Sequence, residues 1–323
     1  MTKHYTESPE AYQLYLKGRF YWNKRTGEAF KKAIEYFQQA IEKDPSYALA
    51  YAGLADAYGL STTYSVSRPQ ESYPKAKAAA KKAVELDQTL AEAHTSLAKV
   101  LILQDWNLAE SNREFQRAIE LNPNYATAHQ WYGNGNLRVM GRFDEAIAEM
   151  KRAQELDPLS LVINSDVGVT YISARQYNQA IEQLRKTTEM DQGFYYAHWW
   201  LGIAYEMKGS LEEALAEYQK ARQLTDDPRM LAMLGHGLAV SGKRDEALRT
   251  LDQLKEMAKE RYVQAYSLTI VYVGLGEKDQ ALQWLERDYQ DRAVDMLSLK
   301  VDPLLDSLRS DPRFADLVRR VGL

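Results

Sequence analysis

The sequence of 323 residues contains no cysteine, which excludes disulfides, thiolate nucleophiles and cysteine-based zinc sites. It also lacks any run of 18 or more apolar residues, so we expect no membrane insertion by this chain. The opening residues, MTKHYTESPEAYQ, contain no apolar run, so we expect no signal peptide. Positive charge is not in excess, since 41 Lys and Arg face 45 Asp and Glu, and this balance argues against nucleic acid as a partner of this region.

A spaced pattern accounts for the frequent alanines and for the 22 tyrosines. Leu201 and Gly202 are followed by Tyr205, and then by Ala214 and Tyr218. The small residue of the Leu-Gly pair returns at Gly18, Ala55, Ala98, Gly133, Gly168, Gly202, Gly235 and Thr269, of which the last five lie 35, 34, 33 and 34 residues apart. A second small residue follows each of these, at Ala33, Ala76, Ser111, Ala146, Ala180, Ala214, Ala247 and Ala281.

This pattern resembles the tetratricopeptide repeat, whose signature of W-x₂-L-G-x₂-Y and A-x₃-F returns with a period of 34 residues. The resemblance implies an all-α fold, a right-handed α-solenoid of about eight helix-turn-helix repeats. The two helices of a repeat cross closely where only a small residue fits. Because a repeat buries its apolar face only against its neighbours, we expect one solenoid domain over residues 1–323, with the repeats at about 8–291 and C-terminal capping helices at 292–323.

Turns separate the helices of the repeats, and insertions lengthen some of them. Asp or Asn before Pro, in KDPS, LNPN, LDPL and DDPR, predicts an N-cap followed by Pro in the first helical turn. Nine extra residues fall within 59–74, where we expect either a longer first helix with a packed loop or a binding loop. Three extra residues fall within 22–28 and one within 103–111, where Trp106 is expected to plug the helix junction. In the tail, Asp302 and Asp311 each precede Pro, which predicts short helices that cover the last open face.

The chain also resembles a narrower group over nearly all of its length. Segments such as YQLYLKGRFYWNKRT, NPNYATAHQWY and VDPLLDSLRSDPRFADL look like the C-terminal repeat region of large bacterial regulators. In those proteins the repeats follow a winged-helix DNA-binding domain, a Ser/Thr kinase or an adenylate cyclase. The resemblance implies a sensing or partner-binding region in bacterial signalling.

We find no arrangement of residues that suggests catalysis, a cofactor or a metal site. GNGNLR and GHGLAV lack the third glycine of a dinucleotide-binding loop and fall inside expected helices. His94, His129 and His198 share one repeat position, so no close pair of metal ligands arises, and we interpret them as imidazoles packed at helix crossings. The chain is therefore not expected to be an enzyme.

The first helix of each repeat is expected to line a concave groove. Its facing residues lie six and three before, and one and four after, the small residue, with the residue two before it at the edge. The candidate partner-binding residues are Tyr12, Tyr15, Trp22, Gln130, Trp131, Asn134, Tyr196, Trp199, Trp200 and Tyr266. A carboxylate clamp is not supported, because Gln130 occupies its lysine position beside Asn134.

These residues predict a non-catalytic scaffold that holds a protein or peptide segment in an aromatic, weakly charged groove. The alternatives are a small-molecule sensor domain and a self-association module, so a homo-oligomer remains possible. We expect the chain to be cytoplasmic, with an extracytoplasmic or periplasmic part of a membrane-anchored parent protein as the alternative.

Overall fold

A computed structural model describes residues 6–64 and 66–323, and in these residues it contains helices and turns without a strand. The expected all-α fold is confirmed. The chain divides into two compact units, Met1–Tyr132 and Gly133–Leu323. One continuous domain over residues 1–323 stays a prediction.

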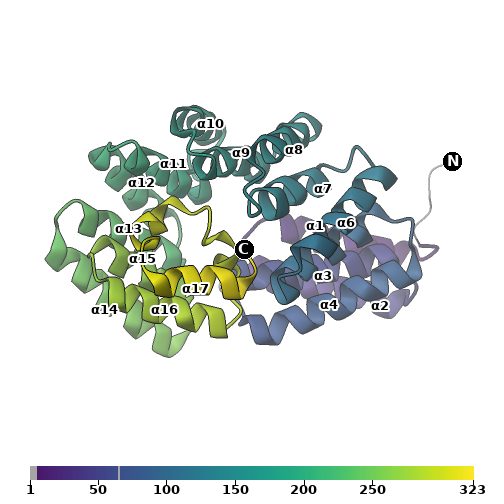
Figure 1. Ribbon diagram of the computed structural model, residues 1–323. Helices are drawn as coiled ribbons and strands as arrows, with labels where there is room; N and C mark the ends of the chain where they lie inside the picture. The colour runs from purple at the N-terminus through teal and green to yellow at the C-terminus, as the bar shows by residue number, and fades with distance from the viewer. Residues whose placement is uncertain (1–5, 65) are drawn as a thin grey trace. The chain divides into compact units, whose positions relative to one another are not determined.

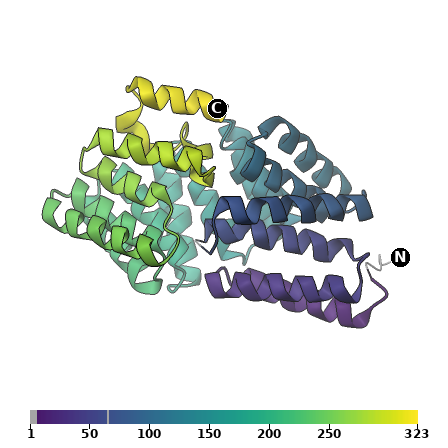
Figure 2. The same ribbon diagram turned by 90° about the horizontal axis from the view of Figure 1, so that it is seen from below.

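The described part of the amino-terminal unit contains three helix pairs and the start of a fourth. Its helices are α1 (Pro9–Asn23), α2 (Gly27–Lys43), α3 (Ala48–Thr63), α4 (Pro69–Leu86), α5 (Ala91–Val100), the π-helix η1 (Leu101–Asp105), α6 (Leu108–Leu121), α7 (Ala126–Gln130) and the π-helix η2 (Trp131–Leu137), inside which the unit boundary falls. Partners within a pair pack side by side, as α1 does with α2 and α3 with α4 (Figure 2).

The carboxy-terminal unit continues the same alternation. Its helices are α8 (Phe143–Leu156), α9 (Leu161–Ser173), α10 (Tyr177–Met190), α11 (Tyr195–Met207), α12 (Leu211–Leu224), α13 (Pro228–Val240), α14 (Arg244–Glu260), α15 (Ala265–Gly274), α16 (Lys278–Gln290), the 3₁₀ helices η3 (Val294–Ser298) and η4 (Pro303–Leu308), and α17 (Pro312–Val321). The first helix of each pair also packs on the next first helix, as α13 does on α15 (Figure 1).

Close helix crossings occur where the repeat pattern predicts them. A Cβ atom added to Gly202 in α11 would lie 2.4 Å from the Tyr218 ring of α12, and one added to Gly168 would lie 2.5 Å from Leu184. Tyr218 and Leu184 are fully buried at these crossings. Tight packing of this kind leaves no room for an extra methyl group, which explains the glycine at these two crossings.

The shared histidine position fastens each first helix to the turn before it. His94, His129 and His198 are buried, and the Nε2 atom of each lies 3.0–3.1 Å from a backbone oxygen six residues earlier, in Gln88, Pro123 and Gln192 respectively. In the fifth repeat Asn164 takes this place and donates to the Pro158 carbonyl at 2.9 Å. A buried polar group needs such a partner, so these side chains hold the turns in place.

Single-residue insertions are absorbed as π-helix. The small residues lie 13 positions apart in the third and fourth repeats, at Ala98 to Ser111 and at Gly133 to Ala146, against 12 in the later repeats. These are the repeats that contain η1 and η2. A π turn accommodates one extra residue without changing the register on either side. Trp106 follows η1 in the left-handed conformation, with φ of 55°, and is half-buried at the junction.

The longer insertion extends a helix and forms a packed loop. α3 continues to Thr63, and α4 begins at Pro69. Ser61, Ser67 and Ser72 form a hydroxyl network with oxygen separations of 2.5–3.2 Å. Residue 65 lies outside the described residues. The loop is therefore held by its own hydrogen bonds at the start of α4.

The prediction that Pro lies in the first turn of a helix is wrong at three of the four turns KDPS, LNPN, LDPL and DDPR. Asp44 ends α2 and accepts from the Ser46 backbone N–H at 2.9 Å, while α3 begins only at Ala48. The same turn, with Pro outside the helix, follows α6 and α8. A side-chain acceptor two residues back stabilises this turn in place of a helix cap. Only Asp227, before Pro228, caps a helix as expected, accepting from Arg229 N–H at 2.9 Å.

The tail forms the expected cap. Asp302 and Asp311 cap η4 and α17, each with Pro as the first helical residue. α17 buries Phe314, Leu317 and Val321 and packs on α16. Burial of this stripe covers the last helix pair, as the end of a repeat array requires.

We expect Gly202→Ala to destabilise the protein by about 1–3 kcal/mol, because the new methyl group overlaps the Tyr218 ring. Gly59→Ala is the matched control, since the nearest atom there is a Leu103 methyl group at 3.3 Å, and alanine has the higher helix propensity. Urea unfolding followed by circular dichroism measures both changes. Equal midpoints for the two variants would contradict close packing at the crossing.

Candidate functional site: the inner faces of the two units

The inner face of a unit is the surface formed by the residues six and three before, and one and four after, the small residue of each first helix, with the residue two before it at the edge. In the amino-terminal unit it brings together Trp22 of α1 and Trp131 of η2, whose ring centroids lie 6.3 Å apart. Both are buried, and so is Gln130 beside them. Tyr15 is half-buried, with its ring 5.4 Å from that of Tyr47. These predicted residues therefore form one cluster.

Charged groups surround this aromatic cluster. Arg19 lies over the Trp22 ring at 4.2 Å and Arg25 at 3.6 Å. Arg19 also pairs with Asp56 at 3.6 Å, and the Ser96 hydroxyl donates to Asp56 at 2.6 Å. Burial raises the pKa of the Asp56 carboxyl to about 6, although Arg19 and Ser96 favour its charged form. The inner face of this unit therefore carries buried charge as well as rings.

In the carboxy-terminal unit the predicted rings of α11 pack on one another. Trp199 and Trp200 stack with centroids 4.9 Å apart, and Tyr196 meets both edge-on at 5.7 and 6.1 Å. The Tyr196 hydroxyl donates to Asp166 of α9 at 3.1 Å, and Arg229 of α13 lies 5.2 Å from the Trp199 centroid. Trp199 is buried, whereas Tyr196 and Trp200 are half-buried. The rings therefore join three successive first helices.

Residues 294–308 cover this inner face. The Arg138 guanidinium, which follows η2, donates to Ser173 of α9 and to Ser298 of the tail, both at 3.2 Å. The Tyr266 hydroxyl of α15 donates to Asp302. Leu304 joins the hydrophobic cluster that includes Trp199, Ile203 and Ile270. Residues from first helices far apart in sequence thus contact the same short segment of the tail. Asn134, the remaining predicted residue of this unit, is half-buried, and its backbone carbonyl accepts from Arg138 at 2.9 Å.

The covering segment is a fixed part of the unit. Its buried apolar side chains are Met296, Leu297, Leu299, Val301, Leu304, Leu305 and Leu308. Burial of these side chains is favourable, so the segment packs as part of the unit, and the inner face of the carboxy-terminal unit is filled by its own chain.

A buried ion pair lies in the same unit. His236 of α13 contacts Glu206 of α11 through Nε2 at 2.7 Å, and its Nδ1 lies 2.7 Å from the Ile270 carbonyl. Since a carbonyl and a carboxylate both accept, both ring nitrogens donate and the imidazole is charged. Burial opposes that charge, but attraction to Glu206 outweighs it and raises the pKa of His236. Burial likewise opposes ionisation of Glu206, but His236 and the Tyr218 hydroxyl lower the pKa of its carboxyl.

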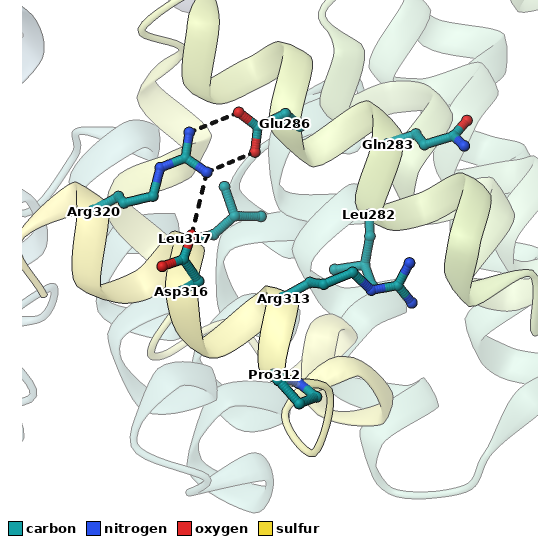
Figure 3. A pocket seen from close by; sticks show the side chains of 8 residues that line it. All are labelled: Leu282, Gln283, Glu286, Pro312, Arg313, Asp316, Leu317 and Arg320. Carbon is teal, nitrogen blue, oxygen red and sulfur yellow. Dashed lines mark hydrogen bonds and ion pairs between the residues drawn. The ribbon is translucent and has the colours of Figure 1, made fainter.

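An open groove lies between α16 and α17 (Figure 3). It has a volume of about 490 Å³ and an apolar floor that includes Leu282 and Leu317. Its charged walls are already paired, because Arg320 makes two bonds to Glu286, at 2.6 and 2.9 Å, and Arg313 bonds Asp279 at 2.8 Å. Paired and exposed groups of this kind fasten the cap and offer little to a ligand.

Sequence reasoning missed several charged residues of the inner faces. Asp56, Lys99 and His236 lie one residue after the small residue of the second, third and seventh repeats. Arg229 lies six residues before the small residue of the seventh repeat. Tyr12 differs from the other candidates, because it is half exposed, whereas they are buried or half-buried. The repeat spacing therefore marks these charged positions as well as the aromatic ones.

Two observations concern metal binding and membrane-spanning helices. In residues 6–64 and 66–323 no group of three or more His, Asp or Glu side chains is placed to hold a metal ion. Over the same residues, none of the helices is both long enough and apolar enough to cross a bilayer.

The His236–Glu206 pair predicts a pH dependence. Because the pKa of His236 is raised above 6.5, its contribution is complete below pH 6.5 and is lost as the pH rises through the folded value. The lowered pKa of Glu206 makes its contribution present above pH 4.5 and lost on further acidification. We expect the unfolding free energy to fall above neutral pH in the wild type and to fall less in Glu206→Gln. Urea titrations from pH 5.5 to 9 measure this, and superimposable profiles would contradict the charged pair.

Comparison with known proteins places these helix pairs in a family. Residues 168–228 match a tetratricopeptide repeat model, and residues 228–253 with 263–287 match a second one. The chain is 23% identical over 265 residues to the transcriptional regulator HilA of Salmonella paratyphi A, covering 82% of this chain and 41% of that protein. It is 22% identical to anaphase-promoting complex subunit 3 of Schizosaccharomyces pombe, covering 79% and 33%. The chain thus spans less than half the length of these relatives.

Solved structures show the same architecture. The crystal structure of the APC/C hetero-tetramer Cut9–Hcn1 aligns with a TM-score of 0.65 and 16% identity, over 95% of this chain and 55% of that one. PilW, a type IV pilus biogenesis factor, aligns with a TM-score of 0.54 and 19% identity, over 69% of this chain and 97% of that one. The repeat models, the spacing of the small residues and the helix pairs agree, and the chain is a tetratricopeptide repeat protein.

Proposed function

We propose that this chain is the partner-binding arm of a regulator and that it holds a protein segment on the inner face of its amino-terminal unit. The tetratricopeptide fold is in general that of a protein-interaction scaffold. The observation that carries the choice of unit is the tail segment, which fills the inner face of the carboxy-terminal unit. On the inner face of the amino-terminal unit, Tyr15, Arg19 and Lys99 keep part of their side chains exposed.

The chemistry of that face suits an extended polypeptide. Tyr15, Arg19 and Lys99 are half-buried, so each presents part of its side chain to a bound segment. Aromatic and arginine side chains in a desolvated cluster are also the usual anchors of protein interfaces.

The role in regulation rests on similarity. The match to HilA, a transcriptional regulator, extends over 82% of this chain, which supports a place in a regulatory protein. The chain itself would contribute binding and no catalysis, since tetratricopeptide repeats generally act as scaffolds. We place it in the cytoplasm, with an extracytoplasmic part of a membrane-anchored protein as the alternative.

A crosslinking experiment tests the location of the binding face. A photoreactive amino acid replaces Lys99 on the inner face, or Lys81, which is exposed on α4 of the same unit. We expect a partner protein to be crosslinked in source cells from position 99 and not from position 81, because only position 99 faces the bound segment. The same adducts from both positions would contradict the proposal.

The identified partner then allows an affinity measurement. We expect Lys99→Glu to weaken binding by about tenfold or more in calorimetry, because it reverses a charge 5.5 Å from the Trp131 ring. Lys81→Glu makes the same change of charge on the outer surface and should leave the affinity unchanged. Thermal melting of both variants separates lost binding from lost folding. Equal affinities of the two variants would show that the partner binds elsewhere.

A further inference from the structure

Two tryptophans on the inner face of the amino-terminal unit gather three cations. Trp22 of α1 and Trp131 of η2 pack together, with ring centroids 6.3 Å apart. The guanidinium groups of Arg19, in α1, and of Arg25, in the turn after it, lie 4.2 and 3.6 Å from the centroid of the first ring. The Lys99 ammonium of α5 lies 5.5 Å from the centroid of the second. Because the face of an indole attracts a cation, the ring pair holds three positive charges close together.

The cations reach the surface of this cluster, whereas the rings lie beneath them. Trp22 and Trp131 are 3% and 5% exposed. A nucleobase therefore finds little ring surface on which to stack, and single-stranded nucleic acid is disfavoured as the occupant. Arg19, Arg25 and Lys99 are half-buried, so part of each side chain is exposed. A bound segment would thus meet positive charge above a buried aromatic base.

The carboxylates at the inner-face positions of this unit balance the cations only in part. Asp56 is buried and pairs with Arg19 at 3.6 Å. Glu92 lies in the first turn of α5 and Lys99 in its last turn, about 10 Å apart along the helix axis. Three cations against two carboxylates leave an excess of one positive charge. Like charges held this close repel one another, so an anion beside them is favoured.

We propose that the protein segment held on this inner face carries an aspartate or glutamate whose carboxylate pairs with Arg25 and Lys99. This inference rests on the proposed function and adds the chemistry of the bound segment. One carboxylate matches the excess of one positive charge, whereas a phosphate group would exceed it. Hydrogen bonds between a cation and a carboxylate are among the strong ones. We place the acid on an internal side chain, because Gln130 occupies the lysine position of a carboxylate clamp.

The test uses the whole chain and peptides selected by phage display. The tightest-binding peptides are synthesised with acetylated and amidated ends, so that a terminal carboxylate plays no part. Each is also made with its acidic residues changed to the matching amides. A photoreactive phenylalanine derivative replaces Tyr15 on the inner face, or Lys81, which is exposed on α4 of the same unit, and locates the bound peptide.

We expect the selected peptides to be rich in aspartate or glutamate and to crosslink from position 15 and not from position 81. In fluorescence anisotropy, changing the acid to its amide should weaken binding to the wild type by about tenfold. The same change should cost about threefold or less in Lys99→Gln, because one partner of the carboxylate is already missing. Lys81→Gln is the matched control and should behave as the wild type. Thermal melting separates lost binding from lost folding.

The possible failures can be told apart. Peptides that crosslink from position 15 and bind equally well as amides would overturn this inference and leave the proposed function in place. The same holds if the amide change costs as much in Lys99→Gln as in the wild type, because the acid would then pair elsewhere. If the selection yields peptides that crosslink only from position 81, or none that crosslinks from position 15, both the inference and the proposed function are contradicted.

Discussion

The close crossing of two helices at a small residue is the contact on which the rest of this structure depends. Where Gly202 meets the Tyr218 ring, and Gly168 meets Leu184, no methyl group could be added without movement. The crossing sets the angle within a pair, and the buried histidines set the turn before it. Together they decide which residues of each first helix lie on the inner face and which lie between repeats.

That geometry gives the two units different surfaces. In the carboxy-terminal unit the inner face is occupied by residues 294–308, whose apolar side chains are buried there. In the amino-terminal unit the same positions hold rings, Arg19 and Asp56. Similar repeats thus produce one inner face that is filled and one that carries aromatic rings and charges.

The fold could be predicted from the sequence because a periodic signal is repeated many times. The spacing of the small residues identified the helix pairs. The single extra residue near Trp106 is accommodated by the π-helix η1. The Pro starts after α2, α6 and α8 were mispredicted. After α2 and α6 the side chains of Asp44 and Asn122 accept from the backbone N–H two residues on, which stabilises a turn as readily as a helix cap.

The candidate site was less predictable. Trp22 and Trp131 are contributed by different repeats, and spacing within one repeat does not reveal that they meet. The same holds for Tyr266, whose partner Asp302 comes from a tail outside the period. The charges at Asp56 and His236 did lie at predictable positions, but their effect depends on burial, which the repeat pattern leaves open.

The central claim is that a partner binds the amino-terminal unit while residues 294–308 stay in place. Hydrogen exchange of the free chain and of the chain with its crosslinked partner tests this most directly. The account predicts strong and equal protection of 294–308 in both states, with added protection in α1, α3 and α5 on binding. Loss of protection in 294–308 on binding, with none gained in α1, α3 and α5, would contradict it.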